Sequence, residues 1–481
     1  MISRQGDCMN FKILSDRKLS SLHKGTLELL SCTGMEVQCD EALELLKNAG
    51  ATVKGTRVRI HENLIKWALS TVPSQVILYD RGGKPVLFLG SGNSYWSVGL
   101  GPPYVIDPYS KKRRKVLIND VANAAKLMDY LPNIDYVFSL GTVSDCHPHM
   151  ETIYEFRAEL LNTTKPIFTW GHSAESCRFT LEIASVIRGS RENVQEKPFL
   201  GFYSEPMPPL RHTREGLEKL LFLAENNIPQ CHQSGLIMGA SCPVTVAGAL
   251  VVANAEQLSA LVISQLKRKG SPYIYGAEML GFDMSNGNCS YGAPEMLLTT
   301  AGITGLAHYY GLPLLSHAGT TDSPSVCDCQ AGLEVGSSIL LAALFGVDLV
   351  HNLGFVEAAM AGNLELLAIC DEYLSQVKRF MRGVEVDREH MALDAIHETG
   401  PGGSFLATDH TVRHFRANYF PDLVTRDLYS QWTKGGSKDL YQRANEKVKH
   451  ILQHHCPEPI PDSAVRKIDK IIEEAEKKLT K

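Results

Sequence analysis

The 481-residue chain has the composition of an ordinary globular enzyme, with 44% hydrophobic residues, 21% charged residues and a net charge of -5. This weakly acidic balance offers no basic surface for phosphate groups, which argues against nucleic acid and anionic membranes as partners. The length suffices for one large barrel with extensions or for two or three domains.

The cysteines and the apolar segments indicate a cellular compartment. Twelve cysteines are scattered without a regular framework in a chain too long to need disulfide stapling, so we expect reduced thiols and a cytoplasmic protein. Residues 1–14 lack the continuous apolar core and cleavage site of a signal peptide. The apolar stretch Val244 to Leu266 is long enough to cross a membrane, but Asn254, Glu256 and Gln257 lie at its middle, which favours a buried helix.

The first 115 residues are expected to form a cap of helices and antiparallel strands. Residues 11–70 contain apolar positions at helical spacing in three segments. Residues 76–90, VILYDRGGKPVLFLG, predict a β-hairpin because two apolar runs flank a turn signal. The next loop is rich in glycine and aromatic residues, so Tyr95 and Trp96 are expected to bind a ligand or simply to cover a barrel end.

From residue 116 to residue 410, helix and strand patterns alternate. The expected strands are residues 136–140, 166–171, 198–205, 228–234, 271–279, 312–319, 347–352 and 403–408. Eight strands with intervening helices predict an α/β fold, a closed TIM (β/α)8 barrel, rather than an open doubly wound sheet. No GxGxxG or P-loop pattern follows a strand, which argues against nucleotide binding. Residues 411–481 are charged and helical, and we expect them to pack on the outside of the barrel.

Polar side chains lie at the ends of the sixth and seventh expected strands. Residues 311–352 predict a strand, a loop, a buried helix and a second strand, with His317, Asp322, His351 and Asn352 at or beyond the strand ends. In βα repeats, the loops after the strands face one shared mouth and carry the chemistry. A single His or Asn there more often satisfies local backbone groups. Two adjacent strands ending alike favour function, and we expect His351, Asn352 and Asp322 to be catalytic and His317 to bind substrate.

Zinc chemistry is a weaker hypothesis for this mouth. Cys146, His147 and His149 follow the first expected strand, and Cys327 and Cys329 follow the sixth. Neither spacing is a zinc pattern, and the two loops would lie on opposite sides of an eight-stranded mouth. We therefore predict no metal site.

Aromatic and carboxylate side chains close other strands. Tyr203 and Glu205 end the third expected strand, Tyr275 and Glu278 end the fifth, and Phe355 follows the seventh. A quaternary ammonium ion has no hydrogen-bond donor, so aromatic rings and diffuse negative charge must hold it. Barrel interiors are aromatic in any case, but Glu205, Glu278 and Phe355 are assigned to substrate binding on this pattern.

Longer segments of the chain resemble a known family. The segments are GASCPVTVAGALVVANAEQLSALVISQLKRKGSPYIYG, YGAPEMLL, HYYGLP, TTDSPSVCDCQAG, LFGVDLVHNLG and RDLYSQW. Together they resemble the trimethylamine methyltransferase (MttB-like) family, and the similarity covers most of the chain. One branch of that family carries a pyrrolysine at the end of the sixth strand, where HAGTTDSP holds ordinary residues here. The chain therefore resembles the branch without pyrrolysine, whose members act on quaternary amines, although which of Gly319 to Ser323 aligns with that position stays open.

The resemblance implies a TIM-barrel methyltransferase that moves a methyl group from a quaternary amine to a Co(I) corrinoid. Glycine betaine is the expected substrate, with proline betaine, carnitine and butyrobetaine as alternatives. A quaternary ammonium releases a neutral amine, so the reaction needs no Lewis acid. The betaine carboxylate would need donors from His351, Asn352, His232, Gln233 or backbone amides. The rival hypotheses are a zinc-dependent corrinoid methyltransferase and a non-catalytic betaine-binding barrel.

The chain contains no DxHxxG motif and no Rossmann-like module of its own. The resemblance therefore implies that the corrinoid (cobalamin) arrives on a partner corrinoid protein and that no cofactor is tightly bound. Such an encounter should be transient, through a small polar interface. We also expect a homo-oligomer.

Overall fold

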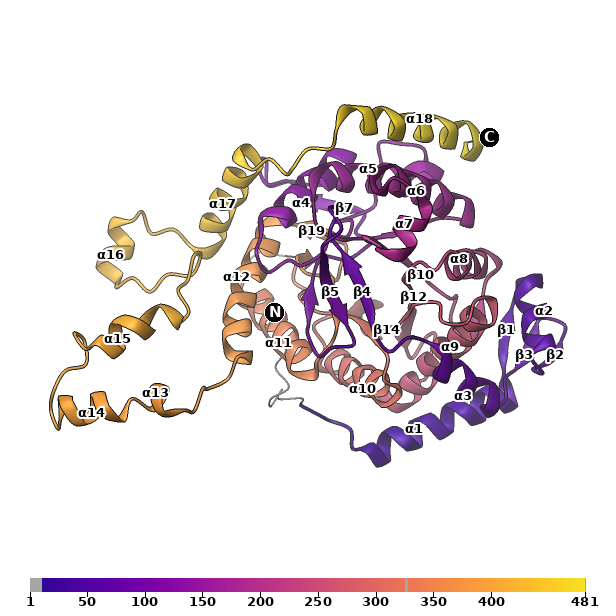
Figure 1. Ribbon diagram of the computed structural model, residues 1–481, viewed down its shortest axis with the longest axis horizontal. Coiled ribbons are helices and arrows are strands. Elements are labelled where there is room, and N and C mark those ends of the chain that lie inside the picture. The colour runs from indigo at the N-terminus through magenta and orange to yellow at the C-terminus, as the bar shows by residue number, and fades with distance from the viewer. Residues whose placement is uncertain (1–10, 325–327, 481) are drawn as a thin grey trace.

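A ring of short parallel strands forms the centre of the computed structural model, which describes residues 11–324 and 328–480 (Figure 1). The strands follow the order β6–β17–β16–β14–β12–β10–β9. Their bounds are Tyr95–Trp96 (β6), Ile167–Trp170 (β9), Leu200–Ser204 (β10), Gln230–His232 (β12), Tyr273–Asp283 (β14), Leu314–His317 (β16) and Leu349–His351 (β17). Most of their residues are buried, as in parallel sheets covered on both faces.

Residues 135–138 close the ring between β6 and β9. The backbone N–H of Asp135 donates to Trp96 at 2.8 Å, and that of Phe168 donates to Val137 at 2.8 Å. Val137 also forms a parallel bridge with Ile167. These bonds complete the eight-stranded wall, and the predicted (β/α)8 barrel is confirmed.

The eighth position in the wall is not occupied by the expected segment. Residues 403–408 form no strand, and Leu406 in them is 86% exposed. β6 fills the position instead, pairing with β17 on one side and with residues 135–136 on the other. The prediction of residues 403–408 as a strand was wrong because a two-residue strand such as β6 shows no alternation in the sequence, whereas an isolated apolar run imitates one.

Long helices surround the barrel. They are α4 (Ile118–Tyr130), η2 (Pro148–Met150), α5 (Glu151–Asn162), α6 (Ala174–Arg188), α7 (Arg191–Glu196), α8 (Arg214–Glu225), α9 (Val246–Lys267), α10 (Pro294–Tyr310), α11 (Cys329–Phe345) and α12 (Leu364–Met381). Side-chain caps start several of them, such as Asp328 at α11, and glycines in the left-handed region, Gly311 and Gly346, end α10 and α11. Among the described residues α9 alone is long and apolar enough to cross a membrane, and 78% of its apolar window is buried inside the protein.

The N-terminal elements cover one side and one end of the barrel. They are α1 (Asp16–Glu28), η1 (Leu29–Thr33), β1 (Met35–Val37), α2 (Asp40–Asn48), β2 (Thr52–Lys54), β3 (Arg57–Arg59), α3 (Glu62–Thr71) and the hairpin β4 (Val76–Tyr79) and β5 (Pro85–Leu89). The predicted helices and hairpin are confirmed. The N–H groups of Tyr79 and Arg81 donate to Pro198 and Thr164, which precede β10 and β9. The hairpin therefore covers the amino ends of the strands, in front of the barrel in Figure 1.

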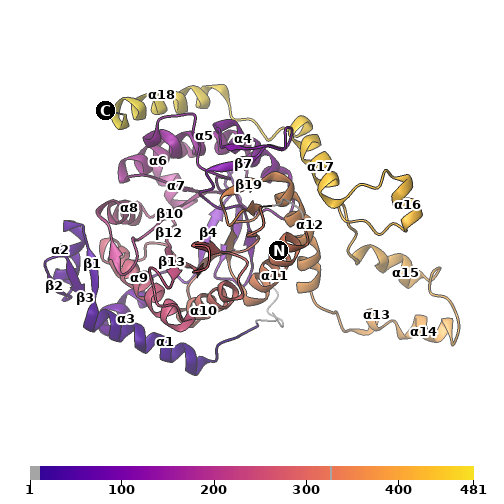
Figure 2. The same ribbon diagram turned by 180° about the vertical axis from the view of Figure 1, so that it is seen from behind.

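Further short strands build up the opposite, carboxyl end, which faces the viewer in Figure 2. β14 continues beyond the wall and pairs with β13 (Ser234–Met238) and β15 (Asn288–Ser290). A separate sheet contains β18 (Phe355–Val356), β19 (Ala361–Asn363), β7 (Tyr104–Ile106) and β8 (Arg113–Lys115), and β11 (Arg211–His212) joins β1.

The C-terminal segment divides into an arm and two packed helices. α17 (Leu440–His454) packs on α12 and α4, and α18 (Asp462–Leu479) packs on α6, as expected for helices on the barrel's outside. Residues 384–418, hereafter the arm, extend away from the barrel and include α13 (Arg388–Met391), α14 (Leu393–Thr399), α15 (Asp409–His414) and η3 (Phe415–Ala417) (Figure 1). α16 (Tyr429–Lys434) follows the arm. The division at residues 115 and 410 stays a prediction.

Candidate active site at the barrel mouth

Two histidines meet at the carboxyl ends of neighbouring strands. Parallel pairing of β16 with β17 sets His317 directly opposite His351. Their rings are nearly perpendicular, with centroids 6.5 Å apart, and both side chains are buried. The expectation that the two strand ends face one mouth is therefore met in the fold.

His351 is bonded through one ring nitrogen and unpaired at the other. Its Nε2 atom lies 3.4 Å from the side-chain Nε2 of Gln233, whereas its Nδ1 atom has no hydrogen-bond partner in the protein. With the Gln233 amide in this orientation its nitrogen donates, so Nε2 of His351 accepts and the proton of the neutral ring is assigned to Nδ1. Burial lowers the pKa of His351 to about 4. The ring is therefore neutral, and its Nδ1 atom lies beside the side chain of Asn352, which opposes the lowering of the pKa.

His317 is also bonded through one ring nitrogen, but in the opposite sense. The hydroxyl of Thr300 donates to the Met296 carbonyl at 3.0 Å, so it accepts from Nε2 of His317 at 3.3 Å, and Nδ1 of the neutral ring is an acceptor without a partner in the protein. Burial, and then the nearby His351, hold the pKa of His317 well below its usual value. The Oε1 atom of Gln233 is likewise buried without a partner. Buried polar atoms in proteins are rarely left unpaired, so these atoms call for a partner such as an ordered water or a small polar ligand.

Carboxyl groups lie on the same side of the barrel. Burial raises the pKa of Glu278 to about 7, against hydrogen bonding by Tyr291, and nearby Glu205 adds to the rise. The side-chain amide of Asn352 donates to Glu278 at 3.5 Å. Glu205 is exposed and accepts a hydrogen bond from the hydroxyl of Tyr203. The mouth thus holds two acidic groups that a bound cation would favour in the ionised form.

Aromatic rings border the histidines. The ring of Phe138 lies 6.3 Å from that of His351 and 6.1 Å from that of Tyr203. Tyr203 lies 6.5 Å from His351, and Tyr291 lies 6.3 Å from His317 on the other side. Aromatic faces next to carboxylates provide the environment that a quaternary ammonium ion requires.

The structure brings together five of the residues proposed from sequence: Gln233, Glu278, His317, His351 and Asn352. Glu205 joins them through Tyr203. Asp322 lies one step away, where its carboxylate accepts the N–H groups of Tyr291 and Gly292 at 2.7 and 3.0 Å. Asp322 fixes the position of Tyr291, and none of its own hydrogen bonds reaches the histidines.

Other residues proposed from sequence lie outside this cluster. His232 is bonded to Ser204 at 2.7 Å and to His212 at 3.3 Å, in a network that reaches α9 through Ser259. The hydroxyl of Tyr95 accepts the N–H of Phe88 at 3.1 Å, in the hairpin at the opposite end of the barrel. Trp96 is buried in β6. Phe355 is also buried, and its backbone carbonyl accepts the N–H of Thr321.

Sequence reasoning missed four participants: Gly99, Phe138, Tyr291 and Thr300. Phe138 belongs to an expected strand, but alternation does not say which of its side chains face the mouth. Tyr291 lies in the turn between β15 and α10, and Thr300 lies inside α10, so neither follows a barrel strand directly. Gly99 follows β6, the strand that sequence periodicity did not reveal.

The zinc ligands considered from sequence do not gather in the described part of the chain. His147 and His149 have ring centroids 5.5 Å apart, and His149 lies 6.2 Å from His172. Within residues 11–324 and 328–480 the compact groups of three ligands occur in the arm and not here. Cys327 lies outside the described residues.

Comparison with known protein families identifies the family of this chain. The family model described as Trimethylamine methyltransferase (MTTB) matches residues 3–480. The chain belongs to this family. A trimethylamine methyltransferase MttB from Desulfitobacterium hafniense (strain DSM 10664 / DCB-2) is 32% identical over 465 residues, which cover 96% of this chain and 93% of that protein. A glycine betaine methyltransferase from Desulfitobacterium hafniense (strain Y51) is 30% identical over 455 residues, covering 93% of each chain.

The solved structures support the fold of this family member. The monomethylamine methyltransferase MtmB of Methanosarcina barkeri aligns with a TM-score of 0.54 at 12% identity, over 93% of this chain and 89% of that one. At that identity the likeness concerns the fold alone. Family membership makes the chain a methyltransferase of the methylamine and betaine type.

Proposed function

We propose that this enzyme removes one methyl group from a quaternary amine of the glycine betaine type and transfers it to the Co(I) corrinoid of a partner protein. Similarity to both a trimethylamine and a glycine betaine methyltransferase leaves the substrate open within the family. The choice between them rests on the residues of the mouth.

The observation that carries the proposal is the set of unpaired polar atoms beside aromatic rings. The Nδ1 atoms of His317 and His351 and the Oε1 atom of Gln233 are buried without partners. A betaine combines a carboxylate, which needs N–H donors, with a cation, which needs rings and negative charge. Trimethylamine has no carboxylate and would leave the Nδ1 donor of His351 unpaired. The neutral ring of His351, with its proton on Nδ1, is therefore assigned to the betaine carboxylate.

The cationic end of the substrate is assigned to the other side of the mouth. Tyr203 and Tyr291 supply ring faces there, and Glu278 and Glu205 supply negative charge. An ionised carboxylate does not donate hydrogen bonds, and a quaternary ammonium ion has no acceptor for them. The two groups therefore suit each other. Holding the molecule at both ends orients one methyl group toward the opening, where an external nucleophile reaches it in line.

The chemistry assigned to the protein consists of binding, orientation and exclusion of water. The ammonium nitrogen leaves as a neutral amine, so none of the side chains has to deliver a proton. Asn352 supports Glu278, and Asp322 supports Tyr291, as positioning residues. The Co(I) corrinoid is a second substrate that accepts the methyl group from outside.

The carrier protein is proposed to dock on the rim of the mouth. Exposed apolar side chains follow successive strand ends: Met207, Val244, Met284, Leu333 and Met360, between 43% and 74% exposed. Methionines and leucine on a rim suit a partner that binds and leaves at each turnover. They add apolar contacts to the small polar interface expected from sequence.

Homo-oligomers and a cytoplasmic setting complete the proposal. The arm exposes Val384, Val386, Met391, Leu393, Leu406 and Val412 by 46% to 88%. A carrier that leaves after each turnover cannot cover these side chains permanently, whereas a second copy of the chain can. None of the ten described cysteines belongs to a disulfide bond, in keeping with a reducing compartment.

A methyl-transfer assay tests the function. The purified enzyme is incubated with cob(I)alamin or with a cognate corrinoid protein and a panel of betaines, carnitine and trimethylamine. We expect a colourless enzyme that converts glycine betaine to dimethylglycine, slowly with the free cofactor and faster with the carrier. Methyl transfer to a thiol or folate without corrinoid would refute the proposal. So would a failure of every betaine to lose a methyl group in excess Co(I), the result expected of a binding barrel. Zinc bound at the mouth and required for methyl transfer would favour the zinc-dependent alternative.

A further inference from the structure

The arm lacks the apolar core that would hold its helices together. None of residues 384–418 is buried, α13 has only four residues and α15 has six. Helices of this length are not stable alone, and small folds without a core are commonly joined by a metal ion or by disulfides. Polar contacts between α13 and α15, and not an apolar core, must therefore hold these two helices together.

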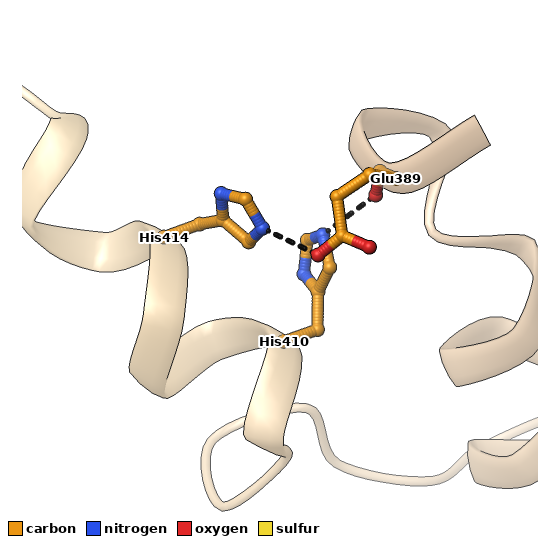
Figure 3. Close-up of side chains that lie close together, drawn as sticks. All are labelled: Glu389, His410 and His414. Carbon is orange, nitrogen blue, oxygen red and sulfur yellow. Dashed lines mark hydrogen bonds and ion pairs between the residues drawn. The ribbon is translucent and has the colours of Figure 1, made fainter. Parts of the chain in front are cut away.

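Two histidines of α15 point to the same side. His410 and His414 are four residues apart, one helical turn, and their ring centroids are 4.4 Å apart. Figure 3 shows both rings directed at Glu389 of α13. This pair places two nitrogen ligands on one face of a helix.

Glu389 completes a group of three potential ligands. The Nε2 atom of His414 pairs with the Glu389 Oε1 atom at 2.9 Å, and Nε2 of His410 donates to the Glu389 backbone carbonyl at 3.1 Å (Figure 3). One ligand atom from each of the three residues lies within 4.8 Å of the others. Tetrahedral zinc needs ligand atoms roughly 3.3 Å apart, given bonds of about 2.0 Å, and small side-chain rotations reach that spacing.

We propose that Glu389, His410 and His414 form a zinc-binding site that joins α13 to α15. Two imidazoles and one carboxylate are ligands that zinc prefers, and three protein ligands leave one position to water. The site lies in the arm and not at the mouth, so it does not rest on the proposed methyl transfer.

The charges around the site are suited to a divalent cation. A second group, Glu385, Asp387 and His390, lies beside the first, with the ring of His390 5.3 Å from that of His414. Its carboxylates are within bonding distance of His390 and add negative potential. Arg413 is a competing cation, 3.1 Å from Oε1 of Glu389, but its side chain is 60% exposed and can turn into solvent when zinc binds.

Another histidine pair provides a matched comparison. His450 and His454 are also four residues apart, on α17, with ring centroids 4.3 Å apart. Among the described residues, no third ligand completes a compact group with them. Two histidines alone bind zinc weakly, so His450→Ala serves as the control for His414→Ala.

Zinc counting tests the site in the full-length protein. The protein is stripped with a chelator, loaded with Zn²⁺, passed through a desalting column and analysed for zinc by mass spectrometry. We expect the wild type and His450→Ala to retain one more equivalent than His414→Ala or Glu389→Gln. Competition with a chromophoric chelator should show about tenfold or greater weakening in those two variants. Equal zinc in all four proteins, or none in the wild type, would overturn the proposal.

Limited proteolysis provides a readout specific to the arm. Zinc should slow cleavage within residues 384–418 of the wild type and His450→Ala, and have no effect on His414→Ala. Because none of these side chains belongs to the barrel core, the variants should keep the circular dichroism spectrum, melting temperature and oligomeric state of the zinc-free wild type. Zinc protection that persists in His414→Ala would refute the site.

Discussion

Gly99 and Asn352 are packed so closely at the mouth that a Cβ atom on Gly99 would lie 1.7 Å from the Oδ1 atom of Asn352. The same Cβ atom would lie 2.9 Å from Nδ1 of His351. Asn352 itself has a φ of 75°, so its backbone has little freedom to yield. A side chain at position 99 must therefore displace the residues that we assign to the substrate.

Gly99→Ala should reduce kcat/KM for betaine demethylation by about 100-fold, the usual effect of moving a reacting group by about 1 Å. The measurement is steady-state kinetics with excess cob(I)alamin. Gly235→Ala is the matched control, because a Cβ atom there meets nothing within 4 Å. Normal activity of Gly99→Ala would show that Asn352 and His351 are not part of the site.

Glu278 should give the enzyme a pH dependence near neutrality. Its pKa is raised to about 7, so it is largely neutral at pH 6 and ionised at pH 8. The ionised form attracts the ammonium group, and KM for betaine should therefore fall as pH rises through about 7. The pKa values of His351, about 4, and of His317, also lowered, keep both rings neutral across this range.

Glu278→Gln should abolish the pH step and raise KM at pH 8 by about tenfold, as a cation loses its partner in a partly desolvated site. Glu256→Gln is the control, since burial raises the pKa of Glu256 to about 7 as well, but its carboxylate binds the N–H of Leu210 beside α9. If the pH dependence of KM survived in Glu278→Gln and disappeared in Glu256→Gln, Glu256 and not Glu278 would be the group that titrates.

The sequence predicted the barrel and part of the mouth for physical reasons. Strands β9 to β17 are apolar runs between long helices, and their ends carry His317, His351 and Asn352, so periodicity located them. Sequence periodicity did not reveal β6, because its two residues gain their strand conformation from neighbours distant in sequence. His232 and Tyr95 lie away from His351 in the structure, because nearness to a strand end does not determine whether a side chain faces the mouth or the surrounding helices, and their roles in substrate binding stay predictions.

Replacement of His351 separates the two ends of the substrate. His351→Ala should raise KM for glycine betaine by roughly 10- to 100-fold, since a hydrogen bond to a charged group contributes about 1.5–3 kcal/mol. Choline has the same ammonium group without the carboxylate, and its inhibition constant should hardly change. His172→Ala, which removes a half-buried histidine bonded to Glu151, should leave both constants unchanged. Equal weakening of betaine and choline would assign His351 to the cation instead.

Leu333, at the rim, separates docking of the carrier from the chemistry at the mouth. Its side chain is 74% exposed near the start of α11, so a change there should not disturb the core. Leu333→Asp should raise KM for the corrinoid protein by about tenfold, the loss of roughly 1.4 kcal/mol at an interface. The rate with free cob(I)alamin should stay at the wild-type value. Phe88→Asp is the control, because Phe88 is also exposed but belongs to the hairpin at the opposite end of the barrel. If Phe88→Asp impaired transfer to the carrier and Leu333→Asp did not, the carrier would dock at the amino end of the strands, and the proposed route of the methyl group through the mouth would be wrong.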